Sequence, residues 1–232
     1  AERETRAMER EERDRFLDSA RIHEPRFFPA FSTLVFAGLR MGELRGLQRD
    51  DIRRSEIRVE RQVYARRNRI HPGEMVGPPK GSRPGKARRR VVDLAEQLVP
   101  ILHPLVTRGG ESRWLFFDRE PDLETSQAFT NALGWAMERT LARIGLADRR
   151  FTPHSLRHTC ACLIITQSKV QTGDLLLFLA QMLGHDTTSE TEKTYAHWLK
   201  QRNRAAVTAG AERAEEDTAD MPLSATILPF KK

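Results

Sequence analysis

Apolar residues recur with a helical period along most of the chain. Residues 27–38 are apolar on nearly every side, which predicts a buried helix that breaks at Gly38. Later apolar periods predict helices over residues 95–109, 126–145, 155–167, 172–184 and 189–207. The pattern is clearest over residues 126–145, where Ser126 is the predicted N-cap and Gly145 the terminator. The chain is therefore expected to be mainly helical.

The middle of the chain has a different pattern. Residues 56–65 alternate apolar and charged side chains, as in a half-buried strand. Glycine and proline are frequent over residues 77–87, and residues 88–94 are typical of a returning strand. A short helix is predicted over residues 40–44. The sequence thus predicts an α+β fold, mainly α-helical, with a small antiparallel sheet and a basic loop at its tip.

The two ends of the chain differ from this core. Residues 1–22 alternate acids and bases densely, which predicts a solvated helix with a thin apolar stripe. The first residue is Ala rather than Met, so we expect a domain taken from a longer protein. Residues 208–222, rich in Ala, Glu and Asp, are interpreted as a linker. The apolar segment 223–230 after it would fit a groove or a sheet edge.

Composition narrows the class of protein. The 232 residues include 39 Lys and Arg against 32 Asp and Glu, a formal charge of +7. A chain that is 39% hydrophobic and 31% charged is neither collagenous nor wholly disordered. No apolar run reaches the ~20 residues needed to span a bilayer, and two cysteines make no disulfide framework. A cytoplasmic protein with a polyanionic partner is expected.

Four short segments place polar side chains where the chain otherwise builds its core. They are Gly-Leu-Arg-Met-Gly-Glu-Leu (38–44), Pro-His-Ser-Leu-Arg-His (153–158), Leu-Gly-His (183–185) and Thr-Tyr-Ala-His (194–197). Each segment alone has an ordinary explanation. Arg40 could pair with Glu43 at a helix start, and His185 could be a surface histidine at a helix end.

Together and in this order, the four segments resemble the catalytic domain of the tyrosine recombinases, or phage-type integrases, from about residue 8 to about residue 205. The resemblance implies that a tyrosine attacks a DNA phosphodiester and forms a 3′-phosphotyrosyl bond, with no cofactor and no metal. The implied catalytic residues are Arg40, Lys80, His154, Arg157, His185 and Tyr195, with Glu43 supporting Arg40. Two guanidinium groups suit this chemistry because each can fork onto non-bridging phosphate oxygens.

The lysine that protonates the leaving 5′-hydroxyl has two candidates. Lys80 comes directly after Pro78-Pro79, a lead-in common in the family, and is favoured over Lys86, which lies closer to the returning strand. The basic side chains of the hairpin are expected to hold DNA phosphates; they are Arg83, Lys86, Arg88 and Arg89.

The resemblance also implies an organisation and a set of partners. Residues 1–207 would be the catalytic domain and residues 208–232 a linker with an apolar tail. Two alternatives are open for this tail: it docks on another protomer, or it folds back on its own chain or is disordered. An N-terminal DNA-binding domain is expected to be absent from this chain. The partner would be double-stranded DNA carrying a specific recombination site. On synapsed DNA, copies of the chain would assemble as a homo-tetramer. The chain alone would be a monomer. In the cell it would associate with the nucleoid and not with a membrane.

Three other functions are compatible with parts of the sequence. His154 and His158, four residues apart on a helix, could share a zinc ion, but Cys160 and Cys162 would point to different sides of that helix. A type IB topoisomerase would share the chemistry while relaxing supercoils. A DNA-binding module without catalysis would not need Tyr195.

Overall fold

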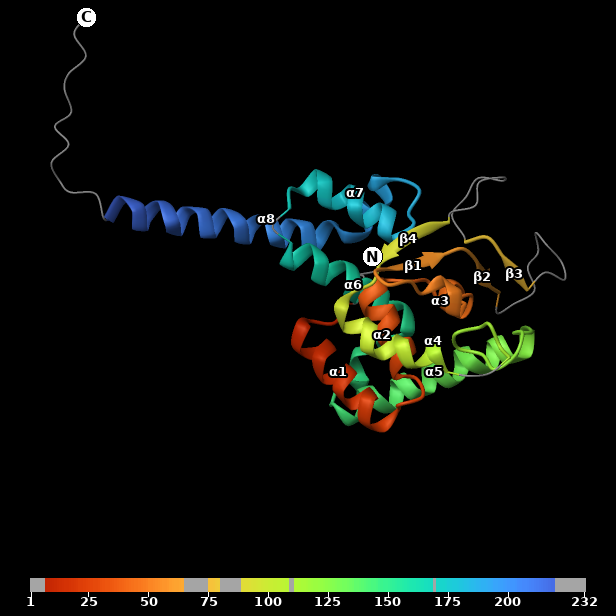
Figure 1. Ribbon diagram of the computed structural model, residues 1–232. Helices are drawn as coiled ribbons and strands as arrows, with labels where there is room; N and C mark the ends of the chain where they lie inside the picture. The colour runs from red at the N-terminus through yellow and green to blue at the C-terminus, as the bar shows by residue number, and fades with distance from the viewer. Residues whose placement is uncertain (1–6, 65–74, 80–88, 109–110, 169, 220–232) are drawn as a thin grey trace, which may run out of the picture.

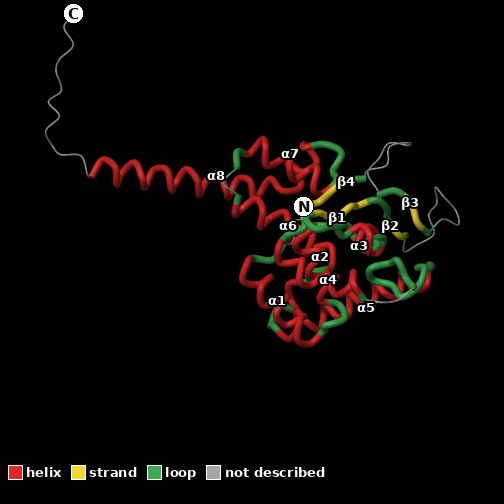
Figure 2. The backbone as a smooth tube through the Cα atoms, viewed as in Figure 1, coloured by secondary structure: helices red, strands yellow, loops and turns green. Residues whose placement is uncertain are grey.

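The computed structural model describes residues 7–64, 75–79, 89–108, 111–168 and 170–219, and describes side chains only up to residue 205 within the last range. Helices dominate it, and two small antiparallel strand pairs lie along one side (Figures 1 and 2). The helices are α1 Arg10–His23, α2 Phe28–Ala37, α3 Met41–Arg45, α4 Val99–Thr107, α5 Leu123–Arg143, α6 Pro153–Gln167, α7 Thr172–Leu183 and α8 Thr188–Ala219. The strands are β1 Glu56–Val59, β2 Gln62–Val63, β3 Val76–Gly77 and β4 Arg90–Asp93.

Helix α2 lies at the centre of the main core. Its residues Phe31, Leu34 and Val35 are buried, as its all-round apolar sequence predicts. Helices α1, α4, α5 and α6 contribute to the same apolar cluster around it. The helix ends at Gly38, which adopts the left-handed conformation with φ +61°. A Cβ there would lie 3.1 Å from Leu183 Cδ2, so this turn also brings α2 close to α7.

A second, smaller apolar cluster joins α6, α7 and the first part of α8. Ile165, Leu179, Leu183, Tyr195 and Leu199 are buried in it. Beyond this contact α8 extends away from the rest of the molecule (Figure 1). It runs to Ala219 and so enters the segment interpreted as a linker. Residues 220–232, which contain the apolar tail, lie outside the described residues.

The predicted returning strand is present, but the first strand is divided. Strand β1 pairs with β4 in antiparallel register, with Glu56 opposite Asp93 and Val59 opposite Arg90. Strand β2 pairs separately with β3. Arg45 explains the position of β2: its Nε and Nη2 donate to Val63 O at 3.2 and 2.8 Å, and its Nη1 donates to Thr130 Oγ1 at 2.6 Å.

The N-cap predicted for the helix over residues 126–145 is wrong. Helix α5 begins at Leu123, with Asp122 as N-cap: Asp122 Oδ1 accepts from the Thr125 backbone N–H at 2.7 Å. A carboxylate is a favourable cap because it satisfies an unpaired N–H and complements the helix dipole. Ser126 is buried inside the helix instead. Gly145, with φ +73°, lies just beyond the helix end, as predicted.

Candidate active site

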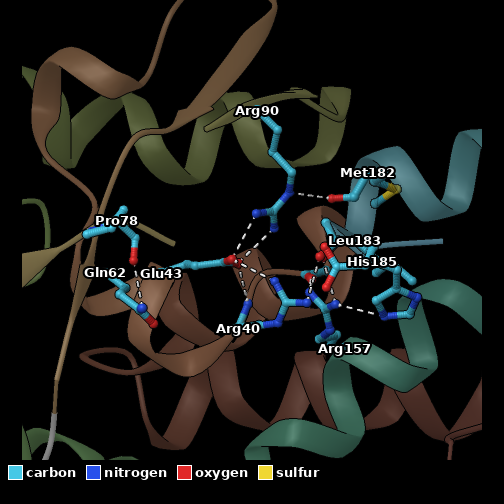
Figure 3. Close-up of polar contacts among 12 residues, drawn as sticks. Arg40, Glu43, Gln62, Pro78, Arg90, Arg157, Met182, Leu183 and His185 are labelled. Carbon is cyan, nitrogen blue, oxygen red and sulfur yellow. Dashed lines mark hydrogen bonds and ion pairs between the residues drawn. The ribbon is translucent and has the colours of Figure 1, made fainter. Parts of the chain in front are cut away.

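The last turn of α7 is the centre of the candidate site. A helix ends with backbone carbonyls that have no partner within the helix. Here three consecutive carbonyls each accept from an arginine: Met182 O from Arg90 Nε at 2.8 Å, Leu183 O from Arg157 Nη2 at 2.8 Å, and Gly184 O from Arg40 Nη2 at 2.8 Å. Figure 3 shows the three guanidinium groups converging on this turn from β4, α6 and the N-terminus of α3.

Arg40 lies at the junction of α2 and α3. It is the N-cap of α3, and its backbone N–H donates to Glu43 Oε2 at 2.8 Å. Its Nη1 also contacts Glu43 Oε1 at 3.1 Å. Glu43 itself is completely buried. The pair expected from the spacing of the two residues is therefore present, and the buried carboxylate orients the arginine.

Arg157 is a charged residue inside the protein. It is 2% exposed and donates to Gly38 O at 2.6 Å as well as to Leu183 O. Burial, followed by the positive charge of Arg40, lowers its pKa to about 10, so the guanidinium remains charged near neutral pH. Its two carbonyl partners come from the ends of α2 and α7, and both helix ends are fixed by left-handed glycines.

His185 comes directly after α7 and contacts Arg157. Arg157 Nη2 lies 3.3 Å from His185 Nε2, and His185 Nδ1 lies 2.8 Å from Thr191 Oγ1. Because a guanidinium only donates, Nε2 is the acceptor and the proton sits on Nδ1. Burial and the charge of Arg157 lower the pKa of His185 to about 4, which keeps the ring neutral.

Tyr195 is fully buried beside these groups. Its ring stacks against that of His185, with centroids 6.5 Å apart and planes 12° apart. Its φ of −115° and ψ of 16° are not helical, so α8 is interrupted at this residue. Burial raises the pKa of the phenol well above its ordinary value, which keeps Tyr195 neutral in this state.

The histidine within hydrogen-bond distance of the Tyr195 phenol, His158, was not a predicted site residue. His158 Nδ1 lies 3.1 Å from Tyr195 Oη, and burial, followed by His154 and Arg157, lowers the pKa of His158 to about 4. Among the described residues, this is the histidine within hydrogen-bond distance of the phenol. His154, assigned as its base, is exposed one turn earlier on α6, with its ring 4.6 Å from that of His158. The four-residue spacing of His154 and His158 was the sequence feature that indicated their proximity.

The tip of the basic hairpin lies outside the part of the chain that the structure describes. This applies to Lys80, Arg83, Lys86 and Arg88. Arg89 is described and exposed, and its Nε lies 3.2 Å from Glu60 Oε2. At the base of the hairpin, Gln62 Nε2 donates to Pro78 O at 2.7 Å (Figure 3).

Arg90, the third arginine of the centre, was not a predicted site residue either. In the sequence it is one more basic residue in the run Arg88-Arg89-Arg90. Its side chain is 9% exposed, and it forks onto the Glu43 carboxylate. Its position in β4, opposite Val59, turns it toward α7.

The described part of the chain holds neither a group of metal-ligating side chains nor a helix fit to cross a membrane. Within it, no three His, Cys, Asp or Glu side chains are grouped so that they would hold a metal ion. Among the described helices, none combines the length and apolar character needed to cross a membrane.

Comparisons with known proteins show the family of the chain. Residues 6–202 match the profile of the phage integrase family. The chain is 26% identical over 190 residues to the prophage integrase IntR of Escherichia coli strain K12, a match covering 73% of this chain and 42% of IntR.

Solved structures share the fold. The Tn1549 transposon integrase in complex with circular intermediate DNA superposes with a TM-score of 0.64 at 19% identity, over 88% of this chain and 66% of that one. The XerA recombinase gives 0.58 at 22% identity, over 88% and 64%. The catalytic domain of bacteriophage HP1 integrase gives 0.54 at 18% identity, over 88% and 95%.

The chain thus spans less than half of IntR but nearly all of an isolated catalytic domain. The family profile covers most of its length and includes all four polar segments from which the site is built. The chain belongs to the phage integrase family.

Proposed function

We propose that this chain cleaves and rejoins double-stranded DNA at a specific site, as the catalytic domain of a recombinase. One observation carries the proposal: Arg40, Arg157, His185 and Tyr195 come from four separate segments and meet at the end of α7. Two charged guanidinium groups beside a tyrosine are what phosphoryl transfer to a phenol requires, because the dianionic transition state needs fixed positive charge.

The proposed reaction is a transesterification. The Tyr195 oxygen attacks the phosphorus, a P–O bond to the tyrosine forms, and the P–O5′ bond breaks. The phenolic proton passes to a histidine of the site, which is His154 in the family assignment. The contact between His158 and Tyr195 supports a different role for His158, which is to hold the phenol before the reaction. The departing 5′-oxygen takes a proton from a hairpin lysine, Lys80 or Lys86. Rejoining reverses these steps, so the phosphodiester bond is conserved without a cofactor.

Tyr195 must move before it attacks. The phenol has no exposed surface, and its oxygen contacts His158. Since α8 is already interrupted at Tyr195, a rotation there exposes the phenol without breaking a regular helix.

Covalent trapping tests the proposal. The 232-residue chain is incubated with a pool of nicked duplexes, whose sequences vary because the recombination site is not known. The nick lets the short cleaved strand dissociate, so that the protein stays attached to the DNA. Denaturing gels should show a protein–DNA band for the wild-type chain and none for Tyr195→Phe. A band that survives in Tyr195→Phe would rule out this nucleophile.

The arginine roles have their own test. Replacing Arg157 by Ala should cost roughly 3 kcal/mol of transition-state stabilisation, or about 10² in single-turnover rate. Cleavage by Arg157→Ala at the wild-type rate would refute the role. A supercoil-relaxation assay separates the topoisomerase alternative, and duplex binding without any covalent product would favour the non-catalytic alternative.

The hairpin is proposed to bind DNA phosphates through Arg83, Lys86, Arg88 and Arg89. Each phosphate contact adds about 0.9 to the slope of log affinity against log salt. The affinity of the chain for a duplex should therefore fall steeply as salt rises, and Arg89→Ala should flatten the slope. An affinity that is independent of salt would contradict this part of the proposal.

Assembly belongs to the same proposal. We assign residues 1–207 to the catalytic domain and residues 208–232 to a segment that docks on another protomer in a tetramer on synapsed DNA. A groove of about 550 Å³, partly lined by the exposed Val91 and Phe178, supplies an apolar surface for such a segment. Deleting residues 210–232 should abolish recombination while leaving single-site cleavage. In the cell, the chain is proposed to act in the cytoplasm at the nucleoid.

A further inference from the structure

The buried carboxylate of Glu43 lies between two guanidinium groups. Arg40 reaches it with one backbone and one side-chain nitrogen, the latter at 3.1 Å. Arg90 reaches it with both terminal nitrogens: Nη1 lies 2.8 Å from Oε1, and Nη2 lies 2.7 Å from Oε2. This forked pairing is the strongest geometry available to an arginine and a carboxylate. Arg90 is therefore the partner that fixes the orientation of Glu43 (Figure 3).

The charge of Glu43 depends on these partners. Burial by itself would raise the pKa of the carboxyl group. The hydrogen bond and charge of Arg90, together with the charge of Arg40, outweigh burial, and the pKa is lowered. The carboxylate is consequently ionised and able to hold both arginines at neutral pH.

Arg90 also fixes the turn that holds the other arginines. Its Nε donates to Met182 O at 2.8 Å, one residue before the carbonyl that binds Arg157 and two before the carbonyl that binds Arg40. At Gly184, a Cβ would lie 3.0 Å from Arg90 Nη1, so the guanidinium packs directly on this turn. All three guanidinium nitrogens of Arg90 are thus engaged with protein atoms.

We propose that Arg90 is a positioning residue for DNA cleavage, which fixes the Glu43 carboxylate and the last turn of α7 and thereby orients Arg40 toward the scissile phosphate. The proposal rests on the function proposed above and adds to it a residue that acts through Arg40. A displacement of about 1 Å in a catalytic group can lower a rate by about 10²-fold. Loss of the fork at Glu43 should therefore slow cleavage much more than it weakens DNA binding.

Arg90→Lys is the main variant, because it keeps the charge but cannot form the fork and the Met182 contact together. Its matched control is Arg58→Lys in β1, the strand that pairs with β4, because this arginine side chain is 47% exposed and has no assigned role in the site. Single-turnover covalent trapping should be slowed roughly 10- to 100-fold in Arg90→Lys, with duplex affinity within about threefold of wild type. Arg58→Lys should cleave at nearly the wild-type rate. Wild-type cleavage by Arg90→Lys would overturn the proposal.

A double variant tests whether Arg90 acts through Arg40. Arg40→Lys combined with Arg90→Lys should cleave no more slowly than Arg40→Lys alone, because the residue being positioned is already replaced. Rate losses that multiply would overturn the proposal. If Arg90→Lys does not fold, Glu43→Gln combined with Arg90→Gln removes both buried charges together, and it should fold and cleave slowly. Cleavage at the wild-type rate by that variant would also overturn it.

A readout without cleavage separates this inference from the function on which it rests. The side-chain Nε–Hε resonance of Arg40, assigned with Arg40→Lys, should shift in Arg90→Lys and stay in place in Arg58→Lys. If the wild-type chain traps no duplex, the proposed function fails, and the Arg40 resonance still tests the contact. An Arg40 resonance unchanged in Arg90→Lys would overturn the positioning role.

Discussion

Lowering the pH from about 7 to about 5 is expected to destabilise the folded chain through the histidines packed around Tyr195. Burial, with His154 and Arg157 adding to it, lowers the pKa of His158 from 6.5 to about 4. The unfolded chain therefore binds a proton near pH 6.5, whereas the folded chain binds it only near pH 4. The folding stability consequently decreases as the pH falls through this window, and the loss is complete below it.

The size of the effect can be worked from the two pKa values. At about pH 5 the difference in proton binding at His158 costs roughly 2 kcal/mol relative to about pH 7. His185 acts in the same direction, because burial and Arg157 also lower its pKa to about 4. The lowered pKa of Glu43 acts at more acidic pH, since its unfolded value is 4.5 and its stabilisation is lost only below that.

Urea unfolding at the two pH values measures the effect. Between about pH 7 and about pH 5, the loss in free energy of unfolding should be roughly 2 kcal/mol smaller in His158→Gln than in the wild-type chain. The glutamine keeps a polar group near Tyr195 but binds no proton. The exposed His103 provides a control, His103→Gln, which should lose as much stability as wild type. If wild type and His158→Gln lose stability in parallel, His158 is not held neutral against Tyr195 and the description of this contact is wrong.

Backbone and thiol positions give three further tests. Gly134, inside α5, has open space around its Cβ position, so Gly134→Ala should stabilise the chain by about 0.5–1 kcal/mol in urea unfolding. Gly46→Ala should instead destabilise it by more than about 1 kcal/mol, because the new Cβ would lie 2.7 Å from the Arg61 backbone oxygen; equal stability would contradict the close approach of the two segments. Burial raises the pKa of Cys160 to about 12 and also raises that of Cys162, so neither thiol should react with a disulfide reagent until urea unfolds the chain.

Periodicity predicted the helices because apolar residues recur at helical spacing or, in α2, continuously along them. The buried character of α2 and the pairing of β1 with β4 could both be predicted from the chain. The division of the first strand could not, because it depends on Arg45, a residue on another element that donates to the Val63 carbonyl. The N-cap of α5 was misplaced because Ser126 and Asp122 are both good caps, and only the hydrogen bond of Asp122 distinguishes them.

The candidate site, like the fold, could be predicted from the sequence only in part. Arg40, Arg157, His185 and Tyr195 were identified through short motifs, and the structure brings them together. The contact between His158 and Tyr195 depends on how α6 lies against α8, which the four-residue spacing of His154 and His158 does not supply. Arg90 was hidden in a basic run, because its partners include a main-chain carbonyl that leaves no trace in the residue pattern.

The three carbonyls at the end of α7 also determine which mutations this centre tolerates. Every residue type carries a backbone carbonyl, so replacing Met182 or Leu183 leaves the acceptors in place. A deletion of one residue within α7 is different, because it rotates the remainder of the helix by about 100° and carries the acceptors away from their arginines. Over evolutionary time, the centre should therefore tolerate drift in side chains here but be intolerant of changes in the length of this helix.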